Sequence, residues 1–166
     1  KSGLIWHIFC EEMEALISAH PLFVRNVVFS DECSFFVNGD VNKHNCRYWD
    51  TENPHVFRES RTQYPEKVNV WAGIFGNHII GPFFINGNLN GQLYLEMLQE
   101  SIFSAINTVI RENQHEFEEE LVHFQQDGAP SHYHRAVRHF LGTQLRGQWI
   151  GRRGVIEWPA RSPDLT

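Results

Sequence analysis

The chain has 166 residues and a formal net charge of −6 at pH 7, and 42% of its residues are hydrophobic. This length and composition favour one folded domain and exclude a disordered or low-complexity segment. No apolar run approaches the roughly 20 residues of a membrane helix, so we expect no membrane partner. Three cysteines, at positions 10, 33 and 46, form no CxxC pair and indicate neither a disulfide framework nor a zinc motif. The cysteines favour a reduced, intracellular setting. The abrupt ends favour a piece of a longer protein.

The charge is unevenly distributed along the chain. Residues 131–166 hold six arginines against two acids, a balance of +4, which leaves −10 on residues 1–130. A solvated basic face and a phosphate-binding edge next to an acidic metal centre both fit this asymmetry. The arginines are at positions 135, 138, 146, 152, 153 and 161.

The first third of the chain predicts a helix followed by strands. Apolar residues recur at helical spacing over 9–18, and His20-Pro21 ends that pattern. The β-type composition that follows predicts strands rather than helices. The strands expected here are 25–29, 34–37 and 45–49, with a hairpin turn at 38–40 and a loop over 51–65.

The rest of the chain predicts a hairpin and then alternating helices and strands. Val68, Val70, Ala72 and Ile74 alternate along one side of a strand, with Trp71 between them as a core residue. The expected elements are strands 67–75 and 78–85, helix 92–111, strand 121–126, helix 131–141 with Ser131 as N-cap, a polar turn at 148–153 and strand 155–158. Early strands followed by this alternation predict an α/β fold, a mixed sheet with helices packed on it.

Two aspartates are each expected at the end of a short apolar strand. Asp31 follows RNVVFS and Asp127 follows LVHFQQ. If the two strands are neighbours, both carboxylates meet at one edge of the sheet, where they suit Mg²⁺. Two such ions about 3.5–4 Å apart would support phosphoryl transfer. Capping of a local turn is the alternative role for either aspartate.

Five sequence blocks occur in an order that resembles a known family. They are FSDE at 29–32, VN and N.RYW within 41–49, VNVWAGI at 68–74, QDGAPSH at 126–132 and WPARSPDL at 158–165. Together they resemble the catalytic domain of mariner-type DNA transposases, which belong to the superfamily named for its Asp-Asp-Asp/Glu triad. The resemblance covers residues 23–166, and residues 1–22 resemble the linker helix that leads into that domain.

The resemblance implies a ribonuclease H-like fold and a metal-dependent cut-and-paste transposase. It makes Asp31 and Asp127 the first two catalytic acids and ligands of Mg²⁺ or Mn²⁺, with two ions expected. The third acid is expected five residues after Asp164, at position 169, so the domain is truncated before it and the fragment alone is expected to be inactive. The implied partners are transposon-end DNA, target DNA and a second copy of the protein, in the nucleus.

Two other functions compete with this one. A degenerate or domesticated transposase remnant would bind DNA or protein without cleaving. Another nuclease of the same fold fits less well, because the QDGAPSH and WPARSPDL blocks are not typical of it.

Four further residues lie close to these motifs. His132 is expected either to approach a DNA phosphate or to orient Asp127, with a hydrogen-bonded residue at the start of a helix as the structural alternative. Arg152 and Arg153 are candidates for phosphate contacts. Glu32 should point away from Asp31 in a strand, so we expect it to have a structural or surface role. The spacing of His132 to its neighbouring histidines matches no zinc pattern.

Overall fold

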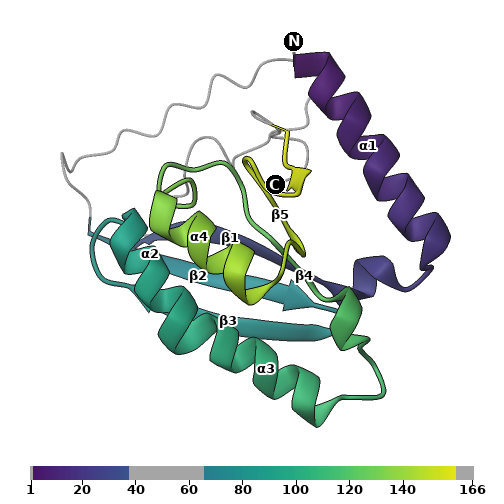
Figure 1. The fold of residues 1–166 in the computed structure, drawn as a ribbon. Helices are drawn as coiled ribbons and strands as arrows, with labels where there is room; N and C mark the ends of the chain where they lie inside the picture. Colours follow the sequence, from purple (N-terminus) through teal and green to yellow (C-terminus); the bar gives the residue numbers. More distant parts are fainter. Residues whose placement is uncertain (1, 38–65, 160–166) are drawn as a thin grey trace, which may run out of the picture.

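The computed structural model describes residues 2–37 and 66–159, and Figure 1 shows their fold. The expected turn at 38–40, the strand at 45–49 and the loop at 51–65 lie outside these residues. Asp164 and most of the last sequence block also lie outside them. Within the described part of the chain, no helix is long and apolar enough to cross a membrane.

The centre of the fold is a six-stranded sheet in the order β3-β2-β1-β4-β5-β6. Strands β1 and β2, and β2 and β3, are antiparallel, whereas β4, β5 and β6 continue the sheet from β1 in parallel. The expected mixed sheet is therefore confirmed. The strands are β1 (Val27–Phe36), β2 (Lys67–Phe75), β3 (His78–Ile85), β4 (His123–Gln125), β5 (Trp149–Gly151) and β6 (Ile156–Glu157).

Strand β1 corrects the expectation of two short strands at 25–29 and 34–37. It is continuous, because every residue from Val28 to Phe36 is paired in register with β2. The polar residues 30–34 suggested a break between two strands, but pairing with β2 satisfies the hydrogen bonds of their backbone groups. Asp31 consequently lies in the middle of a strand, opposite Ala72, and not at a strand end.

The β2–β3 hairpin has the expected boundaries, and Gly76, with φ of 58°, provides its turn. Its two faces have different environments. Trp71 and Phe75 are buried in the core, as expected for Trp71, while Val68 and Ile74 on the alternate face are exposed. The apolar alternation seen in the sequence therefore marks the open face of the sheet.

Two helices begin at other residues than expected, and the long helix between them contains an irregular segment. Helix α1 (Ser2–Ala19) starts before residue 9. The expected helix 92–111 is continuous but contains a π-helical segment, so that it comprises α2 (Gly91–Met97), η3 (Leu98–Ile102) and α3 (Phe103–Glu112). Helix α4 (Arg135–Gln144) begins four residues later than expected, and His134 is its N-cap residue. Ser131 is therefore not the cap, because residues 130–133 form turns.

The sequence analysis missed β5, since residues 148–153 were expected to be a turn. Only Trp149–Gly151 form the strand, which pairs with β4 and buries Trp149 and Ile150. Two short 3-10 helices, η1 (Phe23–Asn26) and η4 (Glu119–Leu121), precede β1 and β4. They shorten the strands expected from 25 and 121.

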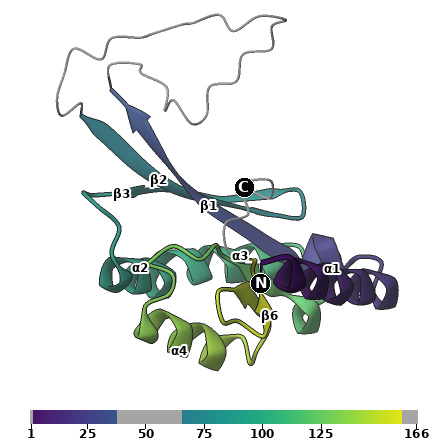
Figure 2. The same ribbon diagram turned by 90° about the horizontal axis from the view of Figure 1, so that it is seen from above.

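Two hydrophobic clusters lie on opposite faces of the sheet. Val28 belongs to the large cluster beneath α2, η3, α3 and α4, and its neighbour Val27 belongs to the cluster that includes Phe9 of α1. Figure 2 shows α2, α3 and α4 on one side of β1–β3. The other side of these strands holds an apolar groove of about 920 Å³ that includes Phe35, Ile79 and Phe84.

Candidate active site

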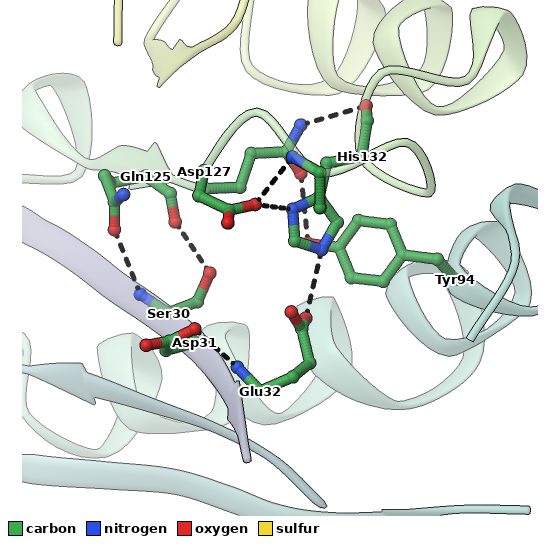
Figure 3. A network of polar contacts seen from close by, with 9 residues as sticks. Ser30, Asp31, Glu32, Tyr94, Gln125, Asp127 and His132 are labelled. Carbon is green, nitrogen blue, oxygen red and sulfur yellow. Dashed lines mark hydrogen bonds and ion pairs between the residues drawn. The ribbon is translucent and has the colours of Figure 1, made fainter. Parts of the chain in front are cut away.

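Strands β1 and β4 bring Asp31 and Asp127 close together. The two strands are parallel neighbours, and their last paired residues are Phe29 and Gln125. Continued for two residues, this register places Asp31 next to Asp127. Burial raises the pKa of Asp31, and the negative charge of Asp127 adds to this shift, as expected for two carboxylates near each other. Figure 3 shows both residues together with Glu32 and His132.

Hydrogen bonds between β1 and β4 fix this arrangement. The Ser30 hydroxyl donates to the Gln125 carbonyl at 2.7 Å, and the Ser30 N–H donates to the Gln125 side chain at 3.3 Å. One residue further on, the buried Gln126 side chain accepts from the Tyr94 hydroxyl of α2 at 3.0 Å. The residue that precedes each acid is thus held by a neighbouring element (Figure 3).

Asp127 is held in the turn that follows β4. Its Oδ1 accepts the Ala129 N–H at 2.9 Å and faces the Nδ1 of His132 at 2.5 Å. Burial acts to raise the pKa of Asp127, but these two hydrogen bonds and the His132 charge outweigh it and lower the pKa. Asp127 therefore stays ionised, with Oδ1 engaged and the carboxylate fixed in orientation.

His132 links Asp127 to Glu32. It is 2% exposed, and its Nε2 lies 3.1 Å from Glu32 Oε1. Burial acts to lower the pKa of His132, but the hydrogen bonds and charges of both carboxylates raise it to about 9. The ring is then protonated near neutral pH and donates from both nitrogens. With both nitrogens on carboxylates, His132 is placed to orient Asp127, and a contact with a DNA phosphate stays a prediction.

The pKa of Asp31 is shifted in the opposite direction from that of Asp127. Burial raises its pKa, and the charges of Glu32 and Asp127 raise it further, although the Glu32 N–H donates to its Oδ1 at 2.8 Å. Asp31 also lines the open groove, on the face of β1 that turns away from the large core cluster. Negative charge is therefore concentrated beside a solvent-accessible space.

Glu32 is the site residue that the sequence analysis missed. It does point away from Asp31, as strand alternation requires, but it meets His132 and keeps its side chain only 21% exposed. No local pattern connects residues that are 100 positions apart. The only signal was the adjacency of two acids in the FSDE block.

The carboxylate oxygens fit a hard divalent cation. Oδ2 of Asp31 and Oδ2 of Asp127 have no hydrogen-bond partner within residues 2–37 and 66–159. Mg²⁺ is commonly held by one or two carboxylates together with water and substrate phosphates. In the same residues, no three His, Cys, Asp or Glu side chains converge on one metal position. The donor set is therefore two carboxylates, of which Asp31 lines the groove.

Arg152 and Arg153 lie in the turn after β5. Both side chains are exposed. A Cβ placed on Gly128 would lie 3.4 Å from Cδ of Arg152, so this side chain packs against the residue that follows Asp127. The guanidinium of Arg152 lies over the Tyr133 ring, 4.3 Å from its centroid.

Comparisons with known proteins agree with this geometry. No protein-family model matches the chain. The Tc3 transposase of Caenorhabditis elegans is 27% identical over 143 residues, which are 84% of this chain and 37% of that protein. The structure of a pre-cleavage Mos1 transpososome matches with a TM-score of 0.68 and 23% identity over 100% of this chain and 46% of the Mos1 chain.

The solved catalytic domain of Mos1 mariner transposase matches 95% of this chain and 61% of its own length, with a TM-score of 0.63 and 23% identity. The chain has the fold of the mariner transposase catalytic domain. The ribonuclease H-like fold and the resemblance to mariner-type transposases expected from the sequence are thus confirmed. Mos1 paired-end complexes with Mn and with Mg have the same fold. The chain spans less than half the length of the Tc3 transposase and of the Mos1 chain in the transpososome.

Proposed function

We propose that this chain is the catalytic core of a cut-and-paste DNA transposase. The observation that carries the proposal is the pairing of β1 with β4, which sets Asp127 beside Asp31, a residue that lines the open groove. The mariner-like fold and the similarity to Tc3 transposase support it. In this proposal residues 23–166 belong to the catalytic domain and residues 1–22 lead into it.

The two aspartates are the proposed ligands of Mg²⁺ or Mn²⁺. A divalent cation held there would stabilise charge on a scissile phosphate and activate a water or a 3′-hydroxyl. His132 keeps Asp127 ionised and fixes its orientation. Burial and the negative charges of Glu32 and Asp127 destabilise the ionised form of Asp31, and a bound cation would offset this effect. The Mos1 complexes with Mn and Mg support this choice of metals.

The proposal extends to the longer protein. A third acid would complete the site from position 169, and transposon ends and target DNA would be the substrates. The Mos1 complex with a transposon end supports a DNA partner. We propose a homodimer acting in the nucleus, where the DNA substrate is found, and an inactive fragment in the absence of the third acid.

Asp127→Asn in the full-length protein tests the function. We expect Mg²⁺- or Mn²⁺-dependent cleavage of a plasmid with the transposon ends to fall below detection, because one ligand charge is lost. Glu157→Gln removes the charge of an exposed acid on β6 and should cleave like the wild type. Circular dichroism of both variants checks the fold. Undiminished cleavage by Asp127→Asn would exclude this residue from the mechanism. Absence of cleavage by the wild type would favour the alternative, a transposase remnant that binds DNA or protein without cleaving.

A further inference from the structure

Three arginines gather around one tyrosine at the edge of the sheet. Tyr133 lies in the turn before α4, and its ring centroid is 4.5 Å from the guanidinium carbon of Arg138, 4.3 Å from that of Arg152 and 5.5 Å from that of Arg153. The arginines come from α4 and from the turn after β5. We call these four residues the arginine cluster.

The arginine cluster has no compensating acid. Within residues 2–37 and 66–159, neither Arg138, Arg152 nor Arg153 forms an ion pair with a carboxylate. Like charges held together repel, and contacts with the tyrosine ring offset only part of that cost. An anion bound between the guanidinium groups would remove the repulsion.

A hollow of about 450 Å³ lies beside the arginine cluster. Arg138 and Arg153 belong to both, and Arg135 and His139 add further exposed basic or polar groups from α4. The guanidinium is planar and donates in pairs, which suits phosphate oxygens. The donors that line the hollow therefore fit a phosphate group.

The backbone at this site is also unusual. Arg153 has φ of 58°, a left-handed conformation that costs energy for any residue other than glycine. Such conformations concentrate at functional sites. Arg146 has φ of 47° but does not line the hollow, so it provides a matched control.

Arg152 connects the arginine cluster to the two acids. Its side chain packs against Gly128, the residue after Asp127, while its guanidinium lies over Tyr133. A phosphodiester backbone passing Asp127 would meet Arg152 and then the hollow. A free anion would use the hollow alone, whereas a DNA strand would use both.

We propose that the arginine cluster binds backbone phosphates of the DNA strand that flanks the phosphate at Asp31 and Asp127. The inference rests on the proposed function, because it takes the two acids as the place where that strand reacts. The arginines act as positioning residues: they hold the strand in register and read no base.

The first test measures binding of the full chain to a fluorescently labelled DNA duplex by anisotropy, in EDTA, at several salt concentrations. Loss of one phosphate contact lowers the slope of log affinity against log salt by about 0.9. We expect this from Arg153→Gly, and about twice this from Arg138→Gln combined with Arg153→Gly. Arg146→Gly removes the same charge at a similar backbone conformation and should keep the wild-type slope. Glycine accommodates positive φ, so both single variants should fold.

The second test separates a built site from a general basic surface. Tyr133→Phe keeps the ring and should bind DNA like the wild type, whereas Tyr133→Leu changes no charge and should bind several-fold more weakly. Equal slopes for Arg153→Gly and Arg146→Gly, or equal affinities for the two Tyr133 variants, would overturn the inference. The inference would also be overturned if Arg153→Gly weakened the binding of inorganic phosphate, measured by competition, but left duplex binding unchanged.

These outcomes are independent of the cleavage test. EDTA removes metal-dependent chemistry, so Asp127→Asn should bind the duplex at least as tightly as the wild type. Cleavage abolished by Asp127→Asn together with unaltered binding by Arg153→Gly would leave the proposed function standing and refute the arginine cluster. The reverse pair of results would refute the role of Asp127 in the proposed function alone.

Discussion

His132 carries the charge that lets Glu32 and Asp127 lie near each other. Both of its ring nitrogens face carboxylates, and their combined effect raises its pKa to about 9 despite burial. A neutral side chain at this position would leave two acids close to Asp31 without compensation. One residue thus sets both the ionisation and the orientation of Asp127.

A second histidine makes folding stability depend on pH. Burial lowers the pKa of His123, although a hydrogen bond to the Leu121 carbonyl opposes this. A histidine with a lowered folded-state pKa contributes its stability above the unfolded pKa of about 6.5 and loses it as the pH falls through the folded value. Acidification below about pH 6.5 should therefore destabilise the fold through His123.

His123→Phe tests this dependence. Phenylalanine keeps the edge-to-face contact with Phe23, whose ring centroid is 5.0 Å from that of His123, but it does not titrate. Urea unfolding at about pH 7.5 and about pH 5 should show a smaller loss of stability for the variant than for the wild type. Equal losses in the two proteins would show that His123 is not responsible.

The sequence revealed part of the site at this scale. Asp31 and Asp127 could be selected because each follows an apolar segment and fits a family block. Glu32 could not, since its partner His132 comes from a turn beyond β4 and the contact exists only in three dimensions. Strand alternation correctly predicted that Glu32 points away from Asp31. It does not predict which residue Glu32 contacts on the other face of the strand.

Helices α2 and α4 approach each other closely at Gly91. A Cβ at this position would lie 2.4 Å from Cβ and Cγ of His134, the residue before α4. This contact fixes where α4 begins, and hence where the turn that carries His132 and Tyr133 can lie. The first residue of α2 therefore has to be small.

Gly91→Ala should cost about 1–3 kcal/mol of stability, because the added methyl group forces the two helices apart. Gly142→Ala is the matched control, as no atom lies within 4 Å of its added Cβ in α4. It should be stabilising by about 0.4–1 kcal/mol. Thermal unfolding of both variants measures the difference, and similar melting temperatures would show that α2 and α4 can separate freely.

The hairpin strands could be predicted with their bounds, whereas short strands were predicted too long, as β4 and β6, or were missed, as β5. The boundaries of β2 and β3 were found because β2 alternates over its whole length and Gly76-Asn77 marks the turn into the apolar residues of β3. The three-residue β5 was missed, since its pairing with β4 is what makes Trp149–Gly151 a strand. The late start of α4 reflects turns over residues 130–133 that local propensity does not reveal.

At the scale of the molecule, one face of β1–β3 is apolar and uncovered by any described residue. Ile79 and Phe84 of the edge strand β3 are 73% and 71% exposed. Large apolar surfaces of this kind mark interaction sites or promote aggregation. The sequence showed the alternation of this sheet but not which of its two faces would be covered.

Replacing Ile79 and Phe84 together by lysine should reduce binding of a hydrophobic fluorescent dye and raise solubility. Because both side chains are exposed, the free energy of unfolding should change by no more than about 0.5 kcal/mol per site. Ile80→Lys is the contrasting variant: Ile80 is 1% exposed on the same strand, so a charge there should be strongly destabilising. A large loss of stability in the double variant would show that this face is packed.

The groove that holds this apolar surface also contains Asp31. Whatever polypeptide or nucleic acid lies over it will displace water from around the carboxylate and lower the local dielectric constant. The attraction between that carboxylate and a cation grows as the dielectric constant falls. A macromolecule that covers this face would therefore also strengthen the binding of the divalent ion proposed at Asp31 and Asp127.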